Sequence, residues 1–294
     1  MYQYEKISKK VRTQIRYIWD DAIGNYYVRG SYDMHSVPNN NGGWHVIRDT
    51  LLREKGLETL ANQRNAKEEC IAYLYECTDI DDLLDIVELT FVYIQNSLGR
   101  IPEYQRDQLT ITQSPDSAID ELNIRLREAG IGYQFESGEI IRVDNQALHA
   151  EVVKPALTLL SDSRFAGAQE EYLAAHAHYR SREYKDAVTD ANNAFESAMK
   201  TICELKGWEY PSGASASNLI GVISKNGLLP DYLDKSFQQL AATLKTGLPQ
   251  VRNEEGGHGQ GSTPKEAPEY IAAYALHLAA AKIVLLVEAF NDSE

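Results

Sequence analysis

An arginine, an asparagine and a histidine lie close together in Leu248–Gly261, between two long helical patterns near the end of the chain. Five residues separate Arg252 from His258, and Asn253 directly follows the arginine. Arginine carries a permanent planar charge that suits a phosphate, and histidine exchanges a proton near neutral pH. Such a pair can cleave RNA without a metal: the base deprotonates a ribose 2′-hydroxyl, and the arginine stabilises charge developing on the adjacent phosphate. Asn253 would orient the histidine or bind a phosphate oxygen.

The glycines inside this segment predict how the pair meets. Gly256 and Gly257 favour the end of a helix, because glycine adopts positive φ without penalty, and His258 can then turn back toward Arg252. The acidic pair Glu254-Glu255 would repel RNA unless it points outward. A helix-ending loop with one arginine and one histidine is also common without catalysis, and that interpretation stays open.

Other chemical motifs are missing from the sequence. It contains no GxxxxGK[ST] phosphate loop, no HExxH, no GxSxG and no clustered His/Cys ligand set, so we expect no cofactor and no metal. His176 and His178 are two positions apart and would point in different directions on a helix. Cys70, Cys77 and Cys203 form neither a metal pattern nor an even disulfide set, which favours a reduced, cytoplasmic setting.

Composition limits the partners. The 294 residues carry a net charge of −14, and both halves of the chain are acidic, so any nucleic-acid contact must be local. The segment Tyr270–Phe290 comes closest to a membrane span, but Glu269, His277, Lys282 and Glu288 interrupt the apolar pattern. We therefore expect a buried bundle helix there, and no membrane partner.

The elements that would position the Arg–His segment are mostly helices. The predicted helices cover residues 4–23, 44–55, 80–94, 115–129, 147–161, 165–180, 184–206, 218–225, 231–247 and 270–290. Residues 131–143 predict a hairpin turning at Ser137-Gly138. The fold class is thus mainly α, with an N-terminal helical domain and small hairpin over residues 1–162 and a C-terminal helical bundle over 163–294. A helix before a hairpin also outlines a winged helix, and hence a transcription regulator, but Arg142 is the hairpin's only basic residue.

The Arg–His spacing and the helical pattern around it resemble a known family. Residues 164–290 look like the C-terminal domain of abortive-infection proteins, a branch of the HEPN superfamily, whose ribonucleases carry an Arg, four to six residues with a polar one first, and a His. Arg252, Asn253 and His258 match that motif, and Glu196 matches a polar or acidic position on the family's second helix. Residues Tyr4–Tyr27 and Asp79–Arg100 resemble the accessory domain of AbiJ-like proteins.

This resemblance implies a metal-independent endoribonuclease of phage defence or toxin-like growth arrest. It also implies a homodimer in which two Arg–His motifs meet, with RNA as substrate and a phage or host trigger sensed by the N-terminal domain. The alanine-rich run Ile271–Ala281 permits the close helix approach that a dimer interface needs. The rival interpretation is a non-catalytic HEPN-like module for dimerisation or nucleotide binding, which the acidic surface favours.

Overall fold

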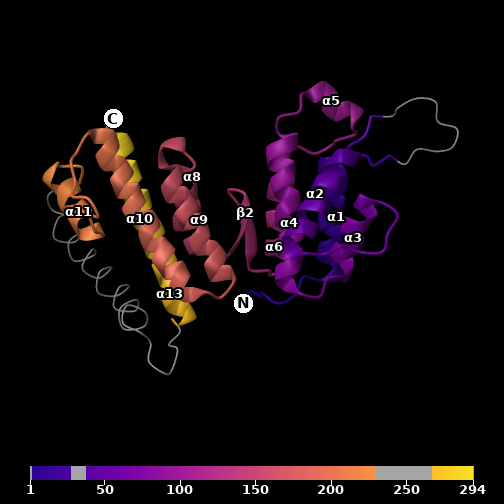
Figure 1. The fold of residues 1–294 in the computed structure, drawn as a ribbon, viewed down its shortest axis with the longest axis horizontal. Coiled ribbons are helices and arrows are strands. Elements are labelled where there is room, and N and C mark those ends of the chain that lie inside the picture. Colours follow the sequence, from indigo (N-terminus) through magenta and orange to yellow (C-terminus); the bar gives the residue numbers. More distant parts are fainter. Residues whose placement is uncertain (1, 28–37, 230–266, 294) are drawn as a thin grey trace. The chain divides into compact units, whose positions relative to one another are not determined.

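The chain folds into helices and one two-stranded β-hairpin in the computed structural model, which describes residues 2–27, 38–229 and 267–293 (Figure 1). This confirms the mainly α fold class. The chain forms two compact units, Met1–Ile141 and Arg142–Glu294. The division by packing thus falls at the end of the hairpin, ahead of the domain boundary predicted near residue 163.

The first unit is built from helices α1 to α6 and the hairpin. Its elements are α1 (Lys9–Ile23), α2 (Asn41–Lys55), α3 (Ala66–Glu76), α4 (Ile80–Tyr93) with a π-helical continuation η1 (Ile94–Leu98), α5 (Glu103–Gln108), α6 (Pro115–Glu128), β1 (Tyr133–Glu136) and β2 (Glu139–Arg142). Trp19 of α1 and Trp44 of α2 are fully buried and meet edge to face, with ring centroids 6.0 Å apart. Aromatic pairs of this geometry anchor a core beyond their area of burial.

Two helix starts follow directly from capping residues in the sequence. The Asp79 side chain accepts hydrogen bonds from the backbone N–H groups of Asp81 and Asp82, at 2.9 and 3.0 Å. Ser114 accepts one from Ser117 at 3.2 Å, with Pro115 at the first helical position. Both satisfy N–H groups that a helix start leaves without partners, and both confirm predicted starts.

The first helix starts later than predicted. Its N-cap is Ser8, whereas the apolar spacing predicts a helix from Tyr4. The residues before Ser8 pair elsewhere: the Gln3 N–H donates to the Gly130 carbonyl at 2.8 Å, and the Tyr4 ring meets the Tyr133 ring edge to face. Contacts with residues more than a hundred positions away therefore override the local helical pattern.

The hairpin turns where the sequence predicts it. Ser137 and Gly138 both have positive φ, 53° and 94°, as a two-residue hairpin turn requires. Phe135, Ile140 and Ile141 are buried, and the Phe135 backbone N–H donates to Asn123 of α6 at 2.8 Å. The hairpin is thus part of a core.

The second unit is a helical bundle. Its elements are α7 (Gln146–Leu148), a π-helical turn η2 (His149–Val153), α8 (Lys154–Leu160), a 3₁₀ turn η3 (Ser163–Phe165), α9 (Ala166–Arg180), α10 (Tyr184–Lys206), α11 (Ala216–Lys225) and α13 (Glu269–Asp292). Helices α9, α10 and α13 pack on one another, α8 packs on α9 and α13, and α11 packs on α10. The antiparallel pair α9–α10 turns at residues 181–183, with Arg182 at φ 65°. This confirms the predicted helix pair within a bundle.

Helices α10 and α13 run in the same direction. The Tyr184 hydroxyl at the start of α10 donates to Glu269 at the start of α13, at 3.1 Å. At the other end, Lys206 Nζ donates to the Ser293 carbonyl at 3.0 Å. The start of α13 therefore lies beside the first turn of α10.

Helix α13 is long and apolar enough to cross a membrane by length and composition alone. About half of its most apolar window is buried inside the protein, where Ala272, Leu276, Ile283 and Phe290 join the bundle core. Core helices of bundles share this composition, so it is weak support for a membrane span.

Candidate functional site

Asn192 and Glu196 form a polar pair in the middle of α10. They lie one turn apart, and Asn192 Nδ2 donates to Glu196 Oε1 at 3.3 Å. The same oxygen accepts the backbone N–H of Ala216, the first residue of α11, at 3.0 Å. A carboxylate in this position accepts a hydrogen bond from an N–H group that the helix start leaves without a partner, and its negative charge interacts favourably with the N-terminal end of the α11 dipole. Glu196 therefore fixes the start of α11 beside α10 through Oε1, and within the described ranges its Oε2 has no hydrogen-bond partner.

A lysine lies buried beside this polar pair. Lys282 of α13 is only 2% exposed, and its Nζ has no hydrogen-bond partner among the residues that the structure describes. The ammonium lies over the ring of Phe195, the residue before Glu196, at 4.8 Å from the centroid. Because burial penalises the charged form, the pKa of Lys282 is lowered to about 7. Sequence pattern alone does not single out this residue, since a lone lysine in an apolar helix pattern indicates only an interruption of that pattern.

An ion-pair network fixes the start of α13. Arg142 Nη2 lies 2.5 Å from Glu269 Oε1, and Arg142 Nε donates to Asp144 at 2.9 Å. Asp144 in turn accepts the hydroxyl of Tyr179, whose pKa is raised by burial and by this bond. The guanidinium also lies over the Tyr179 ring, 5.1 Å from its centroid. Arg142, the last residue of β2 and the first residue of the second unit, thus has its side-chain contacts in that unit, which weakens the case for a DNA-contacting hairpin.

The two histidines on α9 have different surroundings. His176 is buried, both of its ring nitrogens lack partners among the described residues, and burial lowers its pKa to about 3. His178 Nδ1 lies 2.5 Å from Glu183 Oε2. His178, Glu183 and Asp186 each offer one possible metal-ligand atom, and these three atoms lie within 4.8 Å of one another. Glu183 and Asp186 are exposed, so the group resembles an ordinary solvated cluster of charges. Within the described ranges it is the only candidate metal group, and it is not the pair of neighbouring histidines considered from the sequence.

Most of the predicted site falls in residues 230–266, between α11 and α13. Arg252, Asn253 and His258 therefore lie outside the described residues, as does the predicted helix over 231–247. Of the predicted site residues, the structure places Glu196. It also describes a basic pocket in the first unit that sequence reasoning missed, although the spacing of Lys6, Lys9 and Arg12 was a usable signal.

Comparison with known protein families assigns both halves of the chain. Residues 1–158 match AbiJ N-terminal domain 4. The chain belongs to the AbiJ family of abortive-infection proteins. Residues 166–290 match a HEPN-like domain, which confirms the C-terminal resemblance as well. Neither curated proteins nor solved structures gave a match.

Membership in this family implies a role in phage defence. The HEPN-like match runs from the first residue of α9 into the last turns of α13 and therefore spans the α9–α10–α11–α13 bundle. It also covers Arg252, Asn253 and His258. The AbiJ-domain match extends past the hairpin to Thr158 in α8, so the two matches divide the chain between residues 158 and 166.

Proposed function

We propose that this AbiJ protein is a metal-independent endoribonuclease of the HEPN type, acting in the cytoplasm in phage defence or growth arrest. One observation carries the proposal. Arg252 and His258 are spaced by five residues, with the polar Asn253 first, inside a chain segment that matches a HEPN-like domain. An arginine and a histidine held together supply the positive charge and the proton transfer that RNA cleavage through the 2′-hydroxyl needs.

In the proposed reaction, His258 removes the proton from a ribose 2′-hydroxyl. The 2′-oxygen forms a bond to the adjacent phosphorus and the bond to the 5′-oxygen breaks. The products are a 2′,3′-cyclic phosphate and a 5′-hydroxyl, which takes its proton from an imidazolium. Arg252 stabilises the charge on the phosphate oxygens, and Asn253 orients the histidine or binds one of those oxygens.

The length of chain between His258 and α13 allows His258 to reach the polar pair Asn192–Glu196 on α10. His258 precedes Glu269 by eleven positions, and an extended chain spans at most about 3.6 Å per residue. Glu269 lies beside Tyr184, and Glu196 is twelve positions further along α10, about 18 Å at 1.5 Å per residue. A chain of that length therefore covers the distance. In the proposal, Oε2 of Glu196, which has no hydrogen-bond partner among the described residues, orients His258 or Arg252, while Oε1 holds α11.

The proposed enzyme is a homodimer. A single Arg–His pair is a poor anchor for a polyanion in a chain of net charge −14, whereas two pairs across a two-fold axis concentrate positive charge in one cleft. Tyr270, Tyr274 and Leu285 of α13 are exposed apolar side chains that suit such an interface. The N-terminal domain would sense the phage or host trigger.

The decisive experiment is incubation of RNA with purified protein in excess EDTA. We expect cleavage by the wild type, with 2′,3′-cyclic phosphate ends, and a loss of about 10²–10⁴-fold in His258→Ala. His45→Ala is the matched control, because His45 is exposed on α2 and should leave the rate unchanged. Full activity in His258→Ala would remove the assignment from this site. Cleavage that vanishes in EDTA and returns with Mg²⁺ would indicate a metal enzyme.

The second candidate is a non-catalytic HEPN-like module for dimerisation or nucleotide binding. The acidic charge of the chain favours it, because RNA is repelled by a negative surface. It predicts no cleavage in EDTA or in Mg²⁺ and a dimer that persists in Arg252→Ala.

A further inference from the structure

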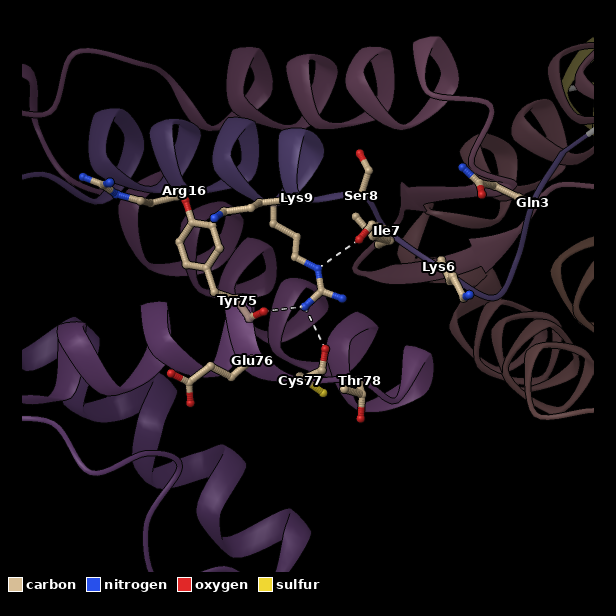
Figure 2. A pocket seen from close by; sticks show the side chains of 11 residues that line it. Gln3, Lys6, Ile7, Ser8, Lys9, Arg16, Tyr75, Glu76, Cys77 and Thr78 are labelled. Carbon is tan, nitrogen blue, oxygen red and sulfur yellow. Dashed lines mark hydrogen bonds between the residues drawn. The ribbon is translucent and has the colours of Figure 1, made fainter.

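A pocket in the first unit concentrates positive charge. It has a volume of about 980 Å³ and lies between the chain leading into α1, the first turns of α1 and the end of α3. Four basic residues and one acidic residue line it, namely Lys6, Lys9, Arg12, Arg16 and Glu76. Figure 2 shows Lys6 and Arg16 at opposite ends, with Lys9 between them. This excess is local, since the chain as a whole is acidic.

Helix periodicity puts the cations on one face. Lys9, Arg12 and Arg16 are spaced at i, i+3 and i+7, so their side chains project from the same side of α1 over about 10 Å of its length. Lys6 adds a fourth charge from the segment before the N-cap. Arg16 is partly neutralised by Asp20, which lies 3.3 Å away. Lys6 and Lys9 form no ion pair within the described part of the chain and remain available to a ligand.

Arg12 is held in place by the end of α3. Its Nε donates to the Ile7 carbonyl at 3.0 Å, and its Nη1 donates to the carbonyls of Tyr75 and Cys77 at 3.1 and 2.7 Å (Figure 2). Nη1 also donates to the Leu74 carbonyl at 2.9 Å. The guanidinium therefore closes the C-terminus of α3, where free carbonyls need donors. Its Nη2 has no partner among the described residues. A charge fixed in this way binds an anion with little loss of side-chain entropy.

The pocket also offers a flat apolar surface. Tyr75 lines it, and its hydroxyl donates to Thr13 at 3.1 Å, which fixes the ring. A volume near 980 Å³ lies at the upper end for small-molecule sites and is far larger than a single phosphate needs. A long polyanion fits less well, because Asp79, Asp81 and Asp82 follow the pocket residue Thr78 directly.

We propose that this pocket binds a nucleotide with two or more phosphate groups. The phosphates contact Lys6, Lys9 and the free Nη2 of Arg12, and the base lies against Tyr75. This assigns a ligand class to the AbiJ N-terminal domain and does not depend on RNA cleavage by the HEPN-like domain.

Titration calorimetry on the full-length protein at low salt tests the proposal, with ATP, ADP, AMP, adenosine and tripolyphosphate as probes. We expect affinity to rise with the number of phosphates, adenosine not to bind, and ATP to bind more tightly than tripolyphosphate. Lys6→Ala/Lys9→Ala should weaken ATP binding about tenfold or more, since two ion pairs are lost. Lys10→Ala is the matched control, because Lys10 is exposed on the same turn but does not line the pocket. Glu76→Gln should tighten ATP binding.

Three results would overturn the proposal. The first is no ATP binding at millimolar concentration in the wild type. The second is equal weakening by Lys6→Ala/Lys9→Ala and Lys10→Ala, which would reduce the effect to general electrostatics. The third is a twelve-nucleotide RNA that displaces ATP and binds more tightly than it, which would make the pocket part of an RNA surface. RNA cleavage assays on the same variants separate this test from that of the HEPN-like site.

Discussion

Replacing Lys282 by methionine should stabilise the C-terminal bundle. The side chain is 2% exposed, it lacks a hydrogen-bond partner among the described residues, and burial lowers its pKa from 10.5 to about 7. One unit of pKa shift corresponds to about 1.4 kcal/mol, so keeping this amine buried costs on the order of 4 kcal/mol at pH 7. The contact with the Phe195 ring offsets about 1–2 kcal/mol of that. Methionine matches the aliphatic stem and needs no partner, so we expect a net gain of about 2–3 kcal/mol.

The pH dependence of this gain identifies its cause. The folded-state pKa of Lys282 lies below the unfolded value, so the unfolded chain binds the extra proton between pH 7 and 10.5. Wild-type stability should therefore rise with pH across this window relative to Lys282→Met, and the gap between them should shrink by about 2 kcal/mol from pH 7 to pH 9.

Urea unfolding at both pH values measures the gap, and hydrogen exchange of α10 and α13 peptides assigns it to the second unit. Lys225→Met, at an exposed position of α11, should change stability by at most about 0.5 kcal/mol at either pH. A gap that does not change with pH, or a loss of stability in Lys282→Met, would refute the reasoning, because the amine would then have a partner that stabilises its charge.

Three further predictions concern acid stability and the Arg–His segment. Burial lowers the folded-state pKa of His176 to about 3, so the folded protein should lose stability as pH falls below 6.5. Urea unfolding at pH 6.5 and pH 5 measures this loss, and His176→Phe should remove about 2 kcal/mol of it. A loss of the same size in His176→Phe would contradict the prediction. Gly257→Val should impair RNA cleavage more than thermal stability, because a β-branched residue resists positive φ, and normal cleavage by this variant would disprove the turn-back of the loop. Mixing inactive Arg252→Ala with inactive His258→Ala should restore part of the activity if a dimer shares its sites, whereas no recovery would confine each site to one chain.

Local signals in the sequence determined much of the fold. Asp79 and Ser114 start their helices because each side chain bonds backbone groups within three residues of itself. Ser137-Gly138 turns the hairpin because the turn needs positive φ at both positions. The pair α9–α10 and the apolar α13 follow from periodicity, which acts over one or two turns. The resemblance to abortive-infection proteins, carried by motif and pattern, was likewise readable from the chain and is confirmed by the family matches.

The tertiary structure decided what depends on distant partners. Helix α3 was not predicted, because its apolar positions Ala66, Cys70 and Leu74 form a weak pattern and its end is closed by Arg12, more than sixty positions earlier. Residues before Ser8 leave the predicted helix to pair near Ile131. The same holds for the site residues. Glu196 was identified by family resemblance, but its role in holding Ala216 depends on how α11 packs, and Lys282 becomes a perturbed group only when the bundle closes over it. Burial and long-range hydrogen bonds are set by the packed chain, and no local window of sequence contains them.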